Sequence, residues 1–172
     1  MGQALVALGQ HDEGVAHLRD AALTFETLAW RTMLAGSLLR LGLALQLASD
    51  DVEAISALAR VPVLSQETHE VYEAAYALAA LGEMRLVQGE RQAGSQALAE
   101  ATALAPQIGL PWHRGGTLLH IAAGHLLLGQ VEAARAAADE AIRLAEEEDL
   151  REVRARGLRL RVQATGRIPS GF

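Results

Sequence analysis

Residues 81–106 read LGEMRLVQGERQAGSQALAEATALAP, and this stretch decides the fold. Two amphipathic segments flank Gly89, and Pro106 follows the second segment. A glycine between two helical patterns readily takes the left-handed conformation that ends a helix, and a proline cannot continue one. The stretch therefore predicts two helices joined by a tight turn.

The same pattern recurs along the chain with a period of about 40 residues. Equivalent positions in successive repeats are, for example, Gly9, Ser49, Gly89 and Gly129. We expect the small residues of the pattern to let the two helices of a pair touch backbone to backbone, and its leucines to face the next pair. The other repeating columns are Gly2, Gly42, Gly82 and Ala122; Gly14, Ala54, Gly94 and Ala134; Leu18, Leu58, Leu98 and Ala138; and Ala21, Val61, Ala101 and Ala141.

The period predicts one domain over residues 1–165, with repeats at about 1–27, 28–66, 67–106 and 107–147 and a capping helix at 150–165. Residues 166–172 are expected to form a flexible tail. The first helices are predicted at 2–8, 30–48, 67–88 and 112–128, and the second helices at 11–27, 51–60, 91–105 and 131–147. Pro62 is expected to end its helix near Arg60 and to leave an irregular connection over residues 61–66.

Composition favours an all-α fold and excludes several classes of protein. Hydrophobic residues make up 51% of the 172 and aromatic residues only 3%, so the apolar mass is alanine and leucine, which suits helix packing better than a β-sandwich. No cysteine is present, which excludes disulfides and thiolate metal sites. No apolar run long enough for a membrane span and no secretory signal pattern occurs, so we expect a soluble, cytoplasmic protein.

Charge is distributed unevenly along the chain. The formal net charge is −6, yet residues 150–172 contain six arginines and only one acidic residue. The rest of the chain is therefore strongly acidic. Because nucleic-acid binding requires clustered positive charge, we expect no nucleic-acid partner.

No motif indicates catalysis, a cofactor or a metal site. The chain has no lysine and so no phosphate-binding P-loop, and its serines lie on no strand-to-helix elbow. His113 and His120 are seven residues apart, which is not the i, i+4 spacing of a helical metal pair. The acidic run 146–149 is interpreted as a solvated helix end. We therefore predict a protein that is not an enzyme and binds no cofactor or metal.

The order of small and large residues resembles that of the tetratricopeptide repeat family. The residues that carry the resemblance are Leu81, Gly82, Gly89, Gly94, Leu98, Ala101 and Pro106. The spacing exceeds the period usual for that family, and leucine and alanine replace its aromatic residues. The longer repeat is similar to the type found beside ATPase modules in bacterial signalling and transcription-regulatory proteins. The pattern begins within a first helix, which indicates either an initial half-repeat or a piece of a longer protein, and we favour the second.

The resemblance implies a right-handed superhelical solenoid of antiparallel helix pairs, with a concave groove lined by the first helices. Helical spacing places twelve residues on the inner face of this groove, and the alternative is that these positions belong to the core or are covered by a second copy of the chain. The twelve are Leu39, Arg40, Leu43, Leu47, Tyr76, Ala79, Glu83, Val87, Leu119, His120, Ala123 and Leu127.

The function expected from this architecture is to bind another protein or a peptide in the groove, with Arg40, Glu83 and His120 orienting the partner. A second patch, consisting of Arg151, Arg154 and Arg161, is a candidate site for an acidic partner, although a solvated cap that complements the acidic body is the more favoured interpretation. Two alternative functions remain: a receptor for a small ligand or signal peptide whose occupancy changes the curvature, and a self-associating unit such as a homodimer. The identity of the partner is not encoded in these patterns.

Overall fold

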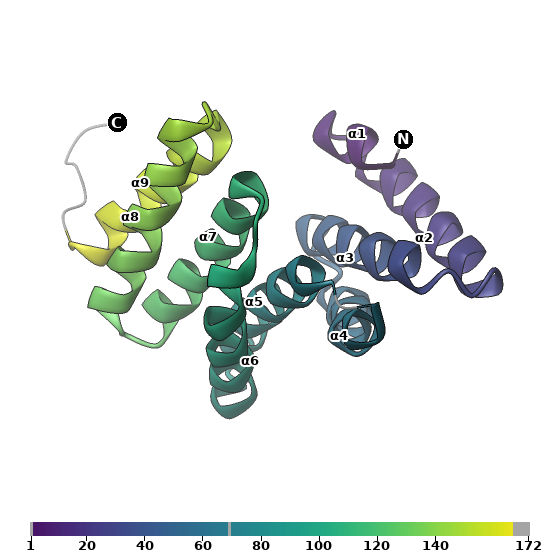
Figure 1. Cartoon of the computed structure of the whole chain (residues 1–172), viewed down its shortest axis with the longest axis horizontal. Helices are drawn as coiled ribbons and strands as arrows, with labels where there is room; N and C mark the ends of the chain where they lie inside the picture. Colours follow the sequence, from purple (N-terminus) through teal and green to yellow (C-terminus); the bar gives the residue numbers. More distant parts are fainter. Residues whose placement is uncertain (1, 69, 167–172) are drawn as a thin grey trace. The chain divides into compact units, whose positions relative to one another are not determined.

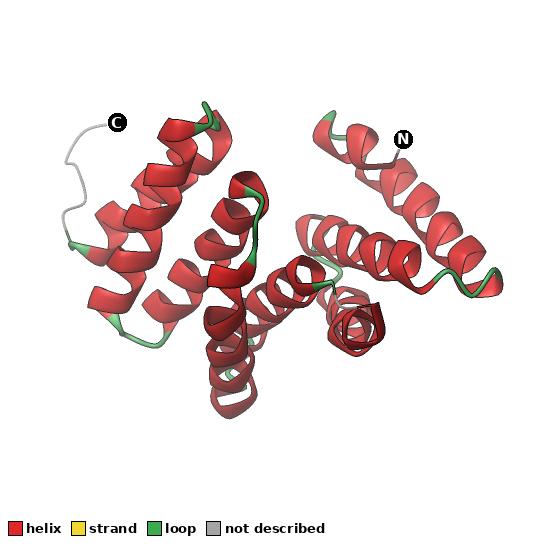
Figure 2. Cartoon of the chain, in the orientation of Figure 1, coloured by secondary structure: helices red, strands yellow, loops and turns green. Residues whose placement is uncertain are grey.

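The computed structural model describes residues 2–68 and 70–166, and every regular element in these ranges is helical (Figure 1, Figure 2). The predicted all-α class is confirmed. Of the predicted tail, Gly166 is described and residues 167–172 lie outside the described residues. The elements are α1 (Gly2–Ala7), α2 (His11–Thr27), α3 (Arg31–Leu47), α4 (Asp51–Thr68), α5 (Val71–Val87), α6 (Arg91–Leu104), the 3₁₀ helix η1 (Ala105–Gln107), α7 (Pro111–Leu127), α8 (Val131–Glu147) and α9 (Arg151–Ala164).

Helices α2 to α9 begin at evenly spaced residues, and each start follows the previous one by half of the sequence period. Most of the turns between them share one hydrogen bond, in which the residue before the new helix donates its N–H to the carbonyl five residues earlier, as in Gln10 to Leu5 (2.9 Å) and Glu90 to Arg85 (2.8 Å). This is the Schellman arrangement, which requires a left-handed residue just after the helix. The left-handed residues of these turns are Gly9, Ala29, Ser49, Gly89, Gly129 and Asp149.

The column of Gly9, Ser49, Gly89 and Gly129 is predicted to hold the left-handed positions, and the structure confirms all four. Ala29 and Asp149 take the same conformation in turns that the repeating columns do not mark, with φ values of 54° and 52°. Left-handed backbone is unfavourable for a residue with a Cβ, so the hydrogen bonds of the turn must hold these two residues in place.

Pro62 does not end its helix, and the prediction of an irregular connection over residues 61–66 is wrong. Helix α4 continues from Asp51 to Thr68 with Pro62 inside it, and α5 begins at Val71 rather than at residue 67. A proline inside a helix removes one backbone hydrogen bond and costs about 3 kcal/mol. Val61 and Leu64 on either side of it are buried, so side-chain packing outweighs the local loss.

Close backbone contact between paired helices is confirmed at the predicted small residues. A Cβ added to Gly94 would lie 3.0 Å from the carbonyl oxygen of Gly82, and one added to Gly14 would lie 2.8 Å from that of Gly2. Leu98 lies beside Gly82: its backbone nitrogen is 3.1 Å from where a Cβ of Gly82 would stand. Its side chain also reaches Gly124 on α7, as the stripe pattern predicts.

The chain divides into two compact units, Met1–Leu78 and Ala79–Phe172. In the first unit α1 packs on α2 and α3, and α3 packs on α2 and α4. In the second unit α7 packs on α6, α8 and α9, and α8 packs on α9. Within each unit, the helix pairs named here are neighbours or second neighbours in the sequence. Among the described residues, the helices lack the combination of length and apolarity that a membrane span requires.

Candidate binding groove

A groove of about 530 Å³ lies in the second unit between α5, α7 and α9. Its polar lining consists of Glu83, Arg156 and Gln163. Its apolar lining consists of Val87, Ala123, Leu126, Leu127 and Leu160.

The sequence period explains why these side chains share one face. Glu83, Ala123 and Gln163 are separated from one another by one period each, as are Val87 and Leu127. The period therefore places equivalent positions of α5, α7 and α9 along the same groove.

A cluster of polar side chains lies beside the apolar lining of the groove. The His120 side chain is only 5% exposed, and its Nδ1 donates a hydrogen bond of 2.5 Å to Oε2 of Glu83. The Arg156 guanidinium lies 3.7 Å from the same oxygen, and its side chain is 40% exposed. The three residues come from α7, α5 and α9, so the cluster joins all three helices of the groove.

Glu83 is held in its charged form by this cluster. Burial raises the pKa of Glu83, but the hydrogen bond from His120 and the electrostatic interactions with His120 and Arg156 lower it by more. The pKa of Glu83 therefore lies below its ordinary value of 4.5. The groove carries an ionised carboxylate at neutral pH whose charge is already engaged by its neighbours.

Four of the twelve residues predicted for the groove line this cavity, namely Glu83, Val87, Ala123 and Leu127. Four others have buried side chains, which is the placement that the alternative interpretation, a position in the core, expects. The buried four are Leu39, Ala79, Leu119 and His120.

The remaining predicted groove residues, Arg40, Leu43, Leu47 and Tyr76, belong to the first unit. Arg40 donates a hydrogen bond of 2.8 Å to the carbonyl of Gly36 on its own helix. Leu47 is 67% exposed, Leu43 is half-buried, and the Tyr76 ring lies 6.0 Å from that of Tyr72. The sequence predicts that Arg40 acts with Glu83 and His120, and only the last two are brought together within one unit.

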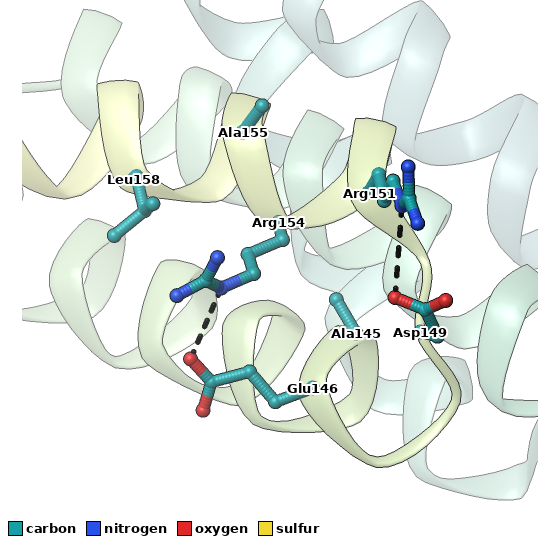
Figure 3. Close-up of a pocket in the computed structure, with 7 residues that line it drawn as sticks. All are labelled: Ala145, Glu146, Asp149, Arg151, Arg154, Ala155 and Leu158. Atoms are coloured by element: carbon teal, nitrogen blue, oxygen red, sulfur yellow. Dashed lines mark hydrogen bonds and ion pairs between the residues drawn. The ribbon is translucent and has the colours of Figure 1, made fainter.

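The three arginines of the predicted acidic-partner patch each lie beside a carboxylate. Arg154 is 3.2 Å from Glu146 and Arg151 is 3.8 Å from Asp149, around a cavity of about 490 Å³ at the turn between α8 and α9 (Figure 3). Arg161 lies 3.4 Å from Asp139 further along α8. The positive charge of these three arginines is therefore matched by carboxylates of α8 and of the turn that follows it.

Sequence reasoning misses the three groove residues of α9, which are Arg156, Leu160 and Gln163. A signal is present, because Arg156 continues the column of Tyr76 and Gln163 continues that of Glu83. Because the charged composition of the final helix indicates a cap, the prediction assigns none of its residues to the groove.

The site suits non-covalent recognition by apolar contact and charge. In the ranges 2–68 and 70–166, no three His, Asp or Glu side chains are grouped so that they could hold a metal ion. No protein-family model matches the chain, and no sequence among the curated proteins matches it either. The likeness to tetratricopeptide repeats therefore remains a prediction from the sequence.

Proposed function

We propose that this chain is a protein-interaction module of the tetratricopeptide-like solenoid type, and that the groove between α5, α7 and α9 binds an apolar segment of a partner protein. The resemblance of the repeats further supports a role as the scaffold or sensor part of a bacterial signalling or transcription-regulatory protein in the cytoplasm. Binding, rather than catalysis, is the activity proposed.

The observation that carries this proposal is the exposure of large apolar side chains inside the groove. Val87 is 66% exposed and Leu127 is 45% exposed, and both lie beside the buried Leu160. Burying such side chains against a partner contributes roughly 25 cal/mol per Å² of apolar surface. An amphipathic helix that fits a groove through leucines at helical spacing is a common way to use such a surface.

The test uses a fluorescein-labelled amphipathic helical peptide with leucines at i, i+3, i+4 and i+7, titrated with the full chain by fluorescence anisotropy. Leu127→Asp should weaken binding by at least about tenfold, because it places a charge at the apolar contact. Val131→Asp is the matched control, because Val131 is 43% exposed in the same unit but lies on α8, outside the groove lining. Equal loss of binding in both variants, or no loss in either, contradicts the proposal.

A small-ligand receptor is the second candidate, since 530 Å³ falls within the range of about 300–1,000 Å³ typical of ligand pockets. It predicts that small apolar compounds raise the melting temperature of the chain while the peptide does not.

Light scattering distinguishes self-association through the same groove from binding of a separate partner. A dimer that Leu127→Asp converts to a monomer would favour self-association over a separate partner.

A further inference from the structure

Helix α9 presents its arginines on two opposite faces. Arg154 and Arg161 are seven residues apart and point toward α8, where Glu146 and Asp139 neutralise them. Arg156 lines the groove, and at helical spacing Arg159 shares its face, between Arg156 and Gln163. The arginines on one face thus form ion pairs with α8, and Arg156 on the other face lines the groove.

The arginines on the groove face are not neutralised in the same way. Among the described residues, Arg156 makes one ion pair, with Glu83, and donates no hydrogen bond. The Glu83 oxygen in that pair already accepts the shorter hydrogen bond from His120. Arg159 is exposed and has no ion pair or hydrogen bond with any described residue. Two guanidinium groups therefore keep donors for an external acceptor.

Of the described residues that line the groove, Glu83 is the acidic one, and its carboxylate accepts the hydrogen bond from His120. The overall net charge of −6 does not decide the sign of the partner, because charges beyond about 8 Å are largely screened at physiological ionic strength. The local arrangement is an apolar lining of leucines, alanine and valine with Arg156 at its edge. Arg159 follows Arg156 by one helical turn on the same side of α9.

We propose that the partner segment is acidic as well as apolar: an amphipathic peptide whose leucine-like side chains enter the groove and whose Asp or Glu carboxylates contact Arg156 and Arg159. This inference rests on the proposed function of the groove and adds the charge of its occupant. Arginine suits the role because its planar guanidinium can donate two parallel hydrogen bonds to one carboxylate.

The experiment compares three labelled helical peptides that share the same leucines and carry Glu, Gln or Lys at the positions flanking them. The Glu peptide should bind the full chain about tenfold more tightly than the Gln peptide, and the Lys peptide should bind least. The preference for Glu over Gln should fall as salt is raised. Equal affinities for the Glu and Gln peptides would overturn the inference.

Variants assign the preference to the groove face. Arg159→Gln should reduce the Glu preference, and Arg156→Gln with Arg159→Gln should bring it below about twofold. Arg159→Glu should reverse the preference, so that the Lys peptide binds more tightly than the Glu peptide. Because Arg159 is exposed, this variant tests the inference even if changes at Arg156 disturb the cluster with Glu83 and His120. Arg154→Gln removes an arginine from the opposite face and should leave the preference intact; its loss there would overturn the inference.

Failure of the two proposals is distinguishable in the same data. If the Glu and Gln peptides bind equally and Leu127→Asp weakens both, the groove binds a partner and only the inferred charge is wrong. If none of the three peptides binds the chain, the groove itself is not the site and both proposals are overturned.

Discussion

Glu83 both lines the groove and contacts side chains of two other helices. Its carboxylate accepts the hydrogen bond from His120 and lies within ion-pair distance of Arg156. Because the fold lowers the pKa of Glu83, the charged form stabilises the folded state. That contribution is present above the ordinary value of 4.5 and is lost as the pH falls through the lower pKa of the folded state.

Replacing Glu83 by glutamine should therefore destabilise the protein in a pH-dependent way. We expect Glu83→Gln to lower the free energy of unfolding by about 1.5–3 kcal/mol at pH 7, the range for a hydrogen bond to a charged group. The difference from the unmodified chain should shrink as the pH is lowered below 4.5, measured by urea denaturation at several pH values.

Glu100→Gln provides the control, because Glu100 is exposed on α6 and should show little change at any of these pH values. A constant difference between Glu83→Gln and the unmodified chain from pH 7 to pH 3.5 would contradict the role given to the charge.

The sequence identifies Glu83 and His120 as groove residues but cannot show that they touch. They lie far apart in the sequence, on α5 and α7, so their contact depends on how successive first helices stack. Helical spacing gives the face of one helix and not the depth at which a side chain ends. For this reason the spacing predicts His120 at the surface, whereas the structure buries it.

At the scale of elements, α4 shows how packing overrides a local rule. Its sequence contains Pro62, and a proline ordinarily ends or kinks a helix. The repeating columns nevertheless indicate that the helix continues here, since Val61 aligns with Ala21, Ala101 and Ala141 in the other second helices. Weighting the repeat above the proline would have predicted the longer helix.

The cost of Pro62 can be measured directly. We expect Pro62→Ala to raise the free energy of unfolding by about 1–2 kcal/mol, because the restored backbone hydrogen bond outweighs the greater freedom of the unfolded chain. Urea denaturation of the full chain is the measurement.

Pro106→Ala is the matched control for this change. Pro106 lies in the first turn of η1, where the missing N–H is not needed by the helix. No gain in stability is expected there, and a gain as large as that of Pro62→Ala would show that helix interruption is not the cause.

At the scale of the whole molecule, helices that pack against each other within a unit are close together along the chain. Within each unit the packed helices are neighbours or second neighbours, as in α7 with α8 and α9. A chain of this kind is stabilised locally, so its parts can open with different free energies. The sequence period allows this organisation to be predicted, whereas the arrangement of the helices as a solenoid remains an expectation from the resemblance.

Local stabilisation predicts that a disruptive change spreads over a limited distance. Gly14→Val places side-chain atoms against Val6 and the carbonyl of Gly2, so it should increase hydrogen exchange in α1 and α2 by about tenfold or more. Amides in α8 and α9 should keep their protection, as followed by mass spectrometry.

Ala16→Val in the same helix is the control, because Ala16 is exposed and can accept a larger side chain. Equal loss of protection in α2 and α9 after Gly14→Val would show that the chain unfolds as one cooperative body instead.

The even spacing of the turns also constrains how the gene can change in length. A codon gained or lost inside a helix would rotate the following face by about 100° and move the next left-handed position off its residue. A gain or loss of half a period would keep the spacing of the turns but put second helices in the places of first helices. We expect related genes to differ in length by whole repeats, each consisting of one first helix and one second helix.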